Sequence, residues 1–326
     1  MNSLRLGRRA VLAAPLLAVP LLRAAAQEAG FGAFLAQVRR EAVARGIRAA
    51  TIDQAFGFAQ YLPHVIELDR KQPEHVITFA EYLEKAVSPQ RKENARRNLV
   101  DNWTLLNRIW RSYGVEPRFV VALWGVESDF GTTMGSYPVV GALATLAYDG
   151  RRSSYFRGEL LAALRILDEG HIRAAAMMGS WAGAMGQCQF MPSTFLNYAV
   201  DYDGDGRRDI WNDRADALAS IANFISHLGW RGGEGWGREV VLPQGFDTNA
   251  TGLELKRPAG EWSRLGVRPV DAAPLVATSE ASLVLPDGDG GPALLVYDNF
   301  RTIMRWNKST YFAAAVGYLA DSMGRG

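Results

Sequence analysis

The segment from residue 118 to residue 131 governs how this chain folds: Arg118-Phe-Val-Val-Ala-Leu-Trp-Gly-Val-Glu127-Ser-Asp-Phe-Gly131. Pro117, just before it, suits the first turn of a helix, and Gly131 suits the end of one. Between them, apolar residues recur at intervals of three and four, which places them on a single helical face. Glu127 falls on the same face, so the pattern predicts a helix whose apolar side carries one carboxylate.

Glu127 is the candidate catalytic residue. Beside Val120, Leu123 and Trp124 its charged form is disfavoured, which raises its pKa toward the range that a general acid needs near neutral pH. The alternative is an ordinary glutamate near a helix end, which turns to solvent or meets an arginine. This segment alone leaves both interpretations open.

Composition limits the classes of protein to consider. The chain has 326 residues, of which 48% are hydrophobic and 21% charged, enough for a large buried core in one large or two modest domains. The formal net charge is only +2, and the arginines occur as scattered pairs, so nothing indicates a nucleic-acid partner. The single cysteine, Cys188, excludes an internal disulfide and a cysteine-based zinc site.

The first residues have the pattern of an export signal. Basic residues precede an apolar run at residues 10–22, and alanines at 24–26 provide a small-residue cleavage site. The pair Arg8-Arg9 also fits the twin-arginine export pattern. We therefore expect a signal peptide at residues 1–26 and a periplasmic protein. No cysteine lies near the cleavage site, so we expect no membrane anchor.

The rest of the chain is predicted to be mainly helical. Helical periodicity extends from residue 31 to about residue 111, with breaks at Pro63, Pro73 and Pro89. Asp216 is a plausible N-cap of a later helix. Further helices are predicted at residues 155–167, 216–228 and 310–323.

A small antiparallel sheet is predicted after residue 230, where short apolar runs alternate with Gly and Pro turns. These runs lie at residues 239–243, 253–255, 282–286 and 293–297. The whole pattern predicts an α+β fold that is mainly α. Its expected parts are an N-terminal helical region (27–110), a catalytic core (111–236), an inserted β region (237–300) and a C-terminal helix that returns to the core (301–326).

The densest motif is Gly179-Ser-Trp-Ala-Gly-Ala-Met-Gly-Gln-Cys-Gln-Phe-Met-Pro-Ser-Thr194. Its small residues allow the backbone to approach a ligand closely, while Gln187 and Gln189 add amides and Phe190 adds flat apolar surface. Amides beside aromatic rings suit a sugar-binding groove. The alternative is a glycine-rich turn that leads into a helix near Pro192.

The segment Asp201-Tyr-Asp203-Gly-Asp205-Gly-Arg207-Arg-Asp209-Ile-Trp-Asn212 has the pattern of a calcium-binding loop. Acidic residues stand at positions 1, 3, 5 and 9, and a glycine fills the sharp turn at position 6. Position 12 is Asn212 rather than glutamate, so Asp213 or Asp216 would have to complete the ligand shell. The alternative is an Asp/Gly turn that holds no metal. The candidate metal ligands, in the EF-hand-like loop 201–216, are Asp201, Asp203, Asp205, Arg207 and Asp216.

Three blocks together carry a family resemblance: residues 124–131, Leu143-Ala-Thr-Leu-Ala-Tyr-Asp149, and residues 179–192. With Leu68-Asp-Arg-Lys-Gln-Pro73 before them and Trp306-Asn307-Lys-Ser309 after them, they span nearly the whole mature chain. The chain resembles the membrane-bound lytic murein transglycosylase B family. This resemblance implies a lysozyme-like catalytic core that cleaves the MurNAc–GlcNAc β-1,4 bond of peptidoglycan without water and leaves 1,6-anhydroMurNAc ends.

The resemblance also implies residue roles. Glu127 matches the family's single catalytic acid/base, and the Asp-Gly loop matches an EF-hand-like calcium site. Phe224, Trp306 and Phe312 stand where the family pattern has Tyr, so hydroxyl contacts are expected to be lost there while stacking remains. The expected glycan-contacting residues are Ser180, Gln187, Gln189, Tyr155, Phe190, Phe224, Trp306 and Asn307.

No cofactor is expected for the chemistry itself, and a structural Ca²⁺ is the one expected ion. The expected partners are peptidoglycan glycan strands and proteins of cell-wall synthesis or division.

A one-carboxylate mechanism is favoured because the nearest second acid, Asp129, points to a different helix face. Glu127 would protonate the bridging oxygen and then take the proton of the C6 hydroxyl as that oxygen closes on C1. One alternative is a water-using muramidase with Asp149 or Asp201 as second acid. Others are a catalytically inactive peptidoglycan-binding protein and a purely structural, calcium-dependent role.

Overall fold

The computed structural model describes residues 18–71, 77–271, 274–275 and 278–324. Residues 1–17 of the predicted signal peptide lie outside the described part of the chain. The fold is mainly helical with small antiparallel sheets, as predicted. Over the described ranges, no helix combines the length and the apolar character that crossing a bilayer requires.

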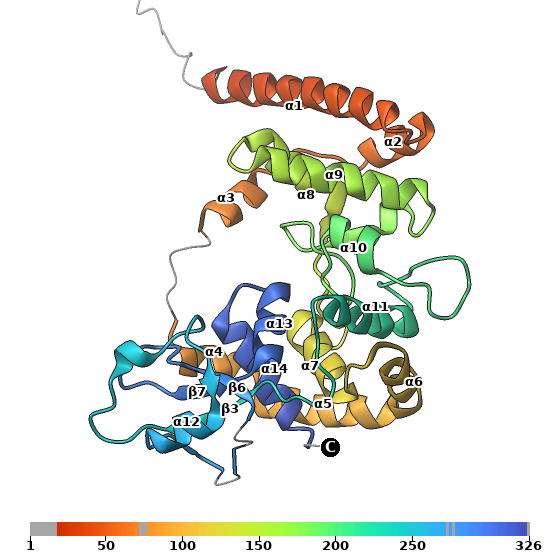
Figure 1. Ribbon diagram of the computed structural model, residues 1–326. Coiled ribbons are helices and arrows are strands. Elements are labelled where there is room, and N and C mark those ends of the chain that lie inside the picture. The colour runs from red at the N-terminus through yellow and green to blue at the C-terminus, as the bar shows by residue number, and fades with distance from the viewer. Residues whose placement is uncertain (1–17, 72–76, 272–273, 276–277, 325–326) are drawn as a thin grey trace, which may run out of the picture.

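A first helical body occupies the upper part of the molecule in Figure 1. Rings of Phe31, Tyr61 and Tyr148 meet there, with centroids 5.4–5.9 Å apart. Asp69, buried in this body, forms ion pairs with Arg151 and Arg152. Its helices are α1 (Ala18–Ala44), α2 (Ala49–Phe56), α3 (Pro63–Lys71), α8 (Val139–Asp149) and α9 (Ser153–Asp168).

A second helical body, in the lower part of Figure 1, surrounds the predicted Glu127 helix. That helix, α7 (Pro117–Ser128), contacts α5, α6, α11 and α14 and is buried along most of its length. The surrounding helices are α4 (Phe79–Ala86), α5 (Pro89–Asp101), α6 (Trp103–Tyr113), α11 (Arg214–His227), α13 (Asp298–Trp306) and α14 (Thr310–Asp321).

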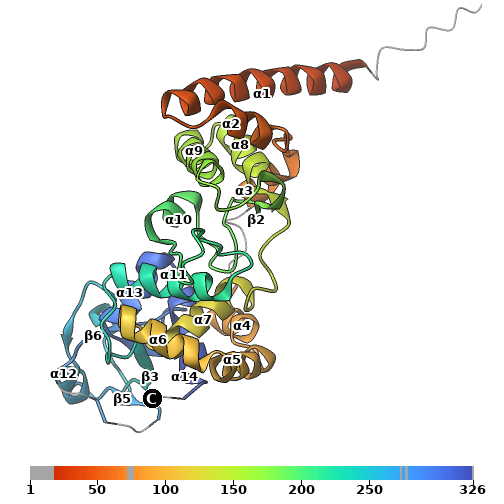
Figure 2. The same cartoon turned by 90° about the vertical axis from the view of Figure 1, so that its right-hand side faces the viewer.

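The expected N-terminal region 27–110 is therefore not one packing unit. Helices α1–α3 pack against α8 and α9, whereas α4–α6 pack around α7, α11 and α14. The chain crosses between the two bodies after α3, again after α7, and once more after α9 (Figure 2). Between the bodies lie α10 (Pro192–Tyr198), which contacts both α9 and α11, and the two-stranded pair β1 (Tyr137–Pro138) and β2 (Met178–Gly179).

The predicted β region is a five-stranded antiparallel sheet in the order β4-β6-β7-β3-β5. It has its own apolar core around Trp262 and Leu295. Two hydrogen bonds connect β3 and the residue before it to α14: Tyr318 donates to Glu239 at 2.9 Å, and Trp236 donates to Asp321 at 3.1 Å. The elements are β3 (Gly237–Val241), β4 (Arg257–Pro258), α12 (Ala259–Arg264), β5 (Arg268–Pro269), β6 (Glu280–Val284) and β7 (Ala293–Val296), with short 3-10 turns at Ala174–Ala176 and Thr248–Ala250.

Two local predictions are wrong. Residues 253–255 form no strand, because the Leu253 and Leu255 carbonyls accept hydrogen bonds from the Ser282 hydroxyl instead of from a neighbouring strand. Asp216 is not the N-cap of α11. Asp213 is, since its carboxylate accepts from the Asp216 amide at 2.9 Å.

Candidate active site

The end of α7 sets the position of Glu127. The helix begins at Pro117, as predicted, but it ends at Ser128 rather than near Gly131. Asp129 and Phe130 both take left-handed backbone conformations, with φ of 48° and 60°. The chain therefore reverses at once, and the Phe130 ring folds back over Gly125, where an added Cβ would lie 2.7 Å from that ring. Close packing beside the turn that follows Glu127 therefore requires a glycine at position 125.

Glu127 lies half-buried in the last turn of α7, and its partner is an indole rather than a cation. Trp306 Nε1 donates a hydrogen bond of 2.7 Å to Glu127 Oε1. Burial raises the pKa of Glu127 from 4.5 to about 7, while the Trp306 hydrogen bond acts in the opposite direction. No Lys or Arg of the described chain forms an ion pair with Glu127. The alternative in which this glutamate pairs with an arginine is therefore wrong.

Three aromatic side chains predicted to contact the glycan meet beside Glu127. The ring centroid of Trp306 lies 4.8 Å from that of Phe224 and 5.5 Å from that of Phe190. Phe190 is buried almost completely, so it supports the other two rings rather than presenting a face of its own. Phe224 and Trp306 are only partly buried. At Trp306 the loss of a tyrosine hydroxyl is offset by an indole N–H that binds the carboxylate.

Gln187 fastens the glycine-rich loop to α7. Its Oε1 accepts from Trp124 Nε1 at 3.0 Å, and its Nε2 donates to the Trp211 carbonyl at 3.1 Å. The Ser128 hydroxyl donates to the Gln187 carbonyl at 2.7 Å. The structure corrects the prediction for Gln187, because this side chain is buried beneath the loop and its amide is engaged by the protein at both ends.

Ser180 and Gln189 lie on the same loop and are partly accessible. The Ser180 hydroxyl accepts from the Ala184 amide at 3.0 Å, which closes a tight turn. Gln189 has a φ of 49°, and its Nε2 donates to the carbonyls of Met134 and Gly186. Its Oε1 has no partner among the described residues, so it is the part of this amide that can accept from a ligand.

Tyr155 and Asn307 lie outside this cluster of contacts. Tyr155 is 48% exposed near the start of α9, in the first helical body, and packs edge-on against Phe156. Asn307 is exposed directly after α13, one residue from Trp306. Their predicted glycan contacts stay predictions.

The nearest acid, Asp129, and the two acids of the muramidase alternative, Asp149 and Asp201, are engaged elsewhere. Asp129 pairs with Arg91 at 3.1 Å, and Asp149 pairs with Arg70 at 2.8 Å. Asp201 accepts backbone hydrogen bonds inside the Asp-Gly loop. The causes of the raised Glu127 pKa include no neighbouring carboxylate.

Sequence reasoning missed Tyr82 on α4. Burial raises the pKa of its phenol, and the negative charge of Glu127 raises it further. Its ring lies 5.6 Å from that of Tyr311. No local pattern distinguishes Tyr82, because its position depends on how α4 packs against α14.

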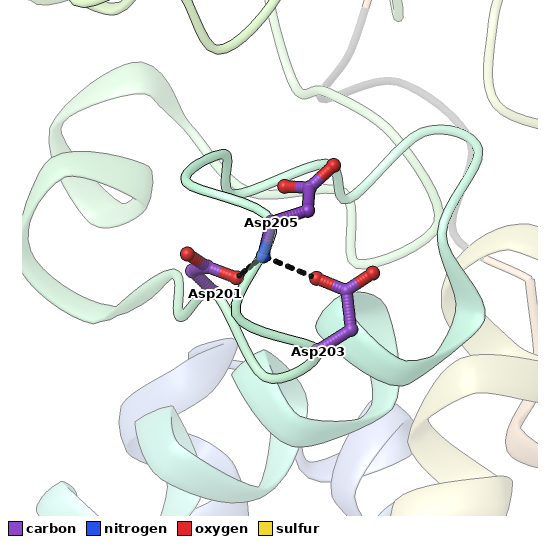
Figure 3. A group of neighbouring side chains, drawn as sticks. All are labelled: Asp201, Asp203 and Asp205. Atoms are coloured by element: carbon purple, nitrogen blue, oxygen red, sulfur yellow. Dashed lines mark hydrogen bonds between the residues drawn. The ribbon is translucent and has the colours of Figure 1, made fainter.

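The Asp-Gly loop gathers three of its predicted ligands. Asp201, Asp203 and Asp205 each offer a carboxylate oxygen within 4.8 Å of the others, and all three are exposed (Figure 3). The loop is held by backbone amides: that of Asp205 donates to Asp201 at 3.1 Å and to Asp203 at 3.0 Å. An exposed set of carboxylate oxygens fits a hard cation such as Ca²⁺.

Asp216 stabilises this loop through hydrogen bonds and is not part of the cluster formed by the other three acids. It is buried, and its two oxygens accept from the amides of Tyr202 and Asp209, both at 2.7 Å. The Arg207 side chain pairs with Asp205 at 2.8 Å. The structure therefore brings together Asp201, Asp203 and Asp205, and it assigns Asp216 to shaping the loop.

Comparisons with known proteins find relatives over most of the chain. The family model described as "Transglycosylase SLT domain" matches residues 30–321. Membrane-bound lytic murein transglycosylase B of Escherichia coli K12 is 36% identical over 249 residues, which are 74% of this chain and 66% of that protein. The chain thus spans just under two thirds of the length of that relative.

Solved structures of related proteins superpose over most of the chain. Pseudomonas aeruginosa SltB3 in complex with NAG-NAM-pentapeptide is 47% identical, with a TM-score of 0.88 over 91% of this chain and 80% of that one. The same protein has also been solved with NAG-anhNAM-pentapeptide, with a TM-score of 0.87. Escherichia coli Slt35 in complex with calcium is 32% identical, with a TM-score of 0.76 over 89% of this chain and 92% of that one.

Proposed function

Because the chain belongs to the transglycosylase SLT domain family, which includes lytic murein transglycosylases, we propose that it cleaves the MurNAc–GlcNAc β-1,4 bond of peptidoglycan without water. The product would end in 1,6-anhydroMurNAc. The observation that carries this proposal is a lone, half-buried carboxylate, Glu127, whose pKa is raised to about 7.

In the proposed mechanism, one carboxylate acts first as general acid and then as general base. A pKa near 7 leaves a large fraction of Glu127 protonated at neutral pH, ready to act as general acid. It gives its proton to the bridging oxygen, and the C1–O bond breaks while the N-acetyl carbonyl of MurNAc supports the positive charge at C1. The Glu127 carboxylate then removes the C6 hydroxyl proton, and O6 bonds to C1. Glu127 ends the reaction protonated, as it began, and no water is consumed because O6 is the oxygen that bonds to C1.

Trp306 orients the carboxylate for these steps. Its N–H holds Oε1, which leaves Oε2 as the oxygen that exchanges the proton with the substrate. An indole N–H only donates, so this contact favours the ionised carboxylate and acts most strongly after the first proton transfer. Gln189 Oε1 and the partly accessible face of Phe224 are the nearby groups we assign to the glycan.

The solved complexes of SltB3 support a substrate with both sugars and a peptide stem, since they contain NAG-NAM-pentapeptide and NAG-anhNAM-pentapeptide. The predicted export signal supports a periplasmic location, where peptidoglycan lies. We also assign a structural Ca²⁺ to Asp201, Asp203 and Asp205, which have the donor chemistry for it.

The direct test replaces the carboxylate with an amide. E127Q keeps the shape and the Trp306 contact but has no proton to exchange, so we expect turnover of purified sacculi to fall at least about 100-fold. D149N and D129N are matched controls, because each removes an acid that already pairs with an arginine. If E127Q retained turnover, or if D149N were as inactive as E127Q, the one-carboxylate assignment would be wrong.

A further inference from the structure

A cavity of about 470 Å³ lies at the opposite end of α7 from Glu127. Pro117, in the first turn of the helix, borders it, and Glu127 is ten residues further on, which is about 15 Å along a helix axis. This cavity is therefore separate from the site described above. Its other walls include Leu99, Trp103, Trp110, Glu116, Arg118 and Met323. The two charged groups of the wall are engaged by the protein: Arg118 pairs with Asp321, and Glu116 accepts hydrogen bonds from Trp230 and from the Gly233 amide.

Two tryptophans of α6 give this cavity an aromatic rim. Trp103 is 49% exposed and Trp110 is 41% exposed, although indole rings are usually covered in folded proteins. They are seven residues apart, so they lie on one helical face at a separation of about 10 Å along the axis. That separation is about the length of a disaccharide in an extended 1,4-linked glycan. Exposed flat rings at this spacing suit the apolar faces of two sugars on one strand.

The segment that forms most of the cavity wall is rich in basic residues. Residues 89–118, which form α5, α6 and the first turn of α7, hold seven Lys or Arg and three Asp or Glu, although the whole chain has a net charge of only +2. Arg97, Arg108 and Arg111 on these helices are exposed, and none forms an ion pair within the described residues. None of the three borders the cavity itself, but they carry unpaired positive charge on the helices that form its walls, and this charge attracts an anionic ligand.

We propose that this groove, defined by Trp103, Trp110 and the cavity between α5, α6 and the end of α14, is a second binding site for peptidoglycan. The rings cover the sugars of a glycan strand, and the arginines attract the carboxylates of its peptide stems. The inference rests on the proposed function for its choice of ligand. Its role would be to hold the enzyme on the insoluble polymer while a separate stretch of glycan occupies the cleft at Glu127.

The test measures binding and turnover separately. Cosedimentation with purified sacculi measures binding at the groove. It is carried out with E127Q, which is expected to leave the polymer intact. Turnover of short soluble muropeptides, by protein in which Glu127 is unchanged, measures the activity of the catalytic site alone. We expect W103A/W110A to weaken sacculus binding about tenfold while kcat on the short substrate stays unchanged.

Controls separate recognition from damage. W103F/W110F keeps flat rings and should retain most of the binding. F58A removes another aromatic side chain that is 41% exposed, far from the groove in sequence, and should have no effect. R108Q/R111Q should weaken binding to intact sacculi but not to sacculi stripped of peptide stems. Thermal melting monitors the fold of each variant.

Three results would overturn the proposal. One is that W103A/W110A binds sacculi as strongly as the protein with both tryptophans. Another is an equal loss in F58A. The third is concentration-dependent self-association that W103A/W110A abolishes without a change in sacculus binding, since the groove would then be an interface between copies of the chain. The two proposals fail in different ways. Digestion of the sacculi by E127Q would show that the catalytic assignment is wrong, whereas unchanged sacculus binding by W103A/W110A would show that the groove is not a binding site.

Discussion

At the scale of single residues, the Glu127–Trp306 pair would allow one carboxylate to act as both acid and base in the proposed mechanism. Burial keeps the proton available by raising the pKa, and the indole N–H stabilises the anion that forms when the proton leaves. Glu127 was recognisable from the sequence because its apolar helical face is a local pattern. Trp306 as its partner was not, because 179 residues separate the two.

The pH profile tests this pair. The first step needs the protonated carboxyl, so activity should fall as pH rises through about 7. The Trp306 hydrogen bond lowers the pKa, so W306F should raise it and move the alkaline limb to higher pH, by up to about one unit. The measurement is kcat/KM against pH on a short soluble substrate.

W230F is the matched control for W306F. Trp230 also donates its indole N–H to a glutamate, Glu116, at 2.8 Å, but this pair lies away from the catalytic carboxylate. The W230F profile should overlay that of the unsubstituted protein. An alkaline limb in W306F that stays in place or moves to lower pH would contradict the role given to Trp306.

At the scale of secondary-structure elements, the end of α7 depends on close packing between Gly125 and Phe130. A Cβ on Gly125 would lie 2.7 Å from the Phe130 ring and 3.1 Å from Leu319. We expect G125A to destabilise the protein by about 1–3 kcal/mol, because the turn after Glu127 must shift. Chemical denaturation gives the change in the free energy of unfolding.

G158A is the control for G125A. Gly158 lies within α9, and nothing lies within 4 Å of the place where its Cβ would go. Alanine is the better helix former, so G158A should be neutral or stabilising by up to about 1 kcal/mol. Equal effects of the two substitutions would show that helix propensity, and not packing at the turn, controls stability here.

The Asp-Gly loop makes a second prediction at this scale. If Asp201, Asp203 and Asp205 hold Ca²⁺, a chelator should lower the Tm of the protein, and added Ca²⁺ should restore it. D201N/D203N should start with a lower Tm and no longer respond to either treatment. D101N, which removes an exposed acid outside the cluster, should respond like the unsubstituted protein. An unchanged Tm on chelation of the unsubstituted protein would contradict the site.

Helices were predicted better than strands at this scale because their signals are local. Pro63 and Pro89 each begin a helix, as the breaks suggested, and α14 spans most of the predicted 310–323. The strands are short, and their pairing depends on partners distant in sequence. Residues 253–255 have strand-like composition, yet the carbonyls of Leu253 and Leu255 accept hydrogen bonds from the Ser282 hydroxyl rather than from a neighbouring strand.

At the scale of the whole molecule, the α+β class and the inserted sheet were predictable, but the two helical bodies were not. The region 27–110 divides between them because α1–α3 find their apolar partners in α8 and α9, whereas α4–α6 find theirs around α7. Which helices share a core is a property of tertiary packing. The same packing brings Trp306 from α13 to the carboxylate of α7.

The central claim is that the substrate's own C6 hydroxyl, and not water, attacks C1. Mass spectrometry of the fragments released from purified peptidoglycan tests it most directly, because an anhydro end weighs one water less than a reducing end. The account predicts anhydroMurNAc ends throughout, with no oxygen taken up when the reaction runs in ¹⁸O-labelled water. Reducing MurNAc ends that carry the label would contradict it.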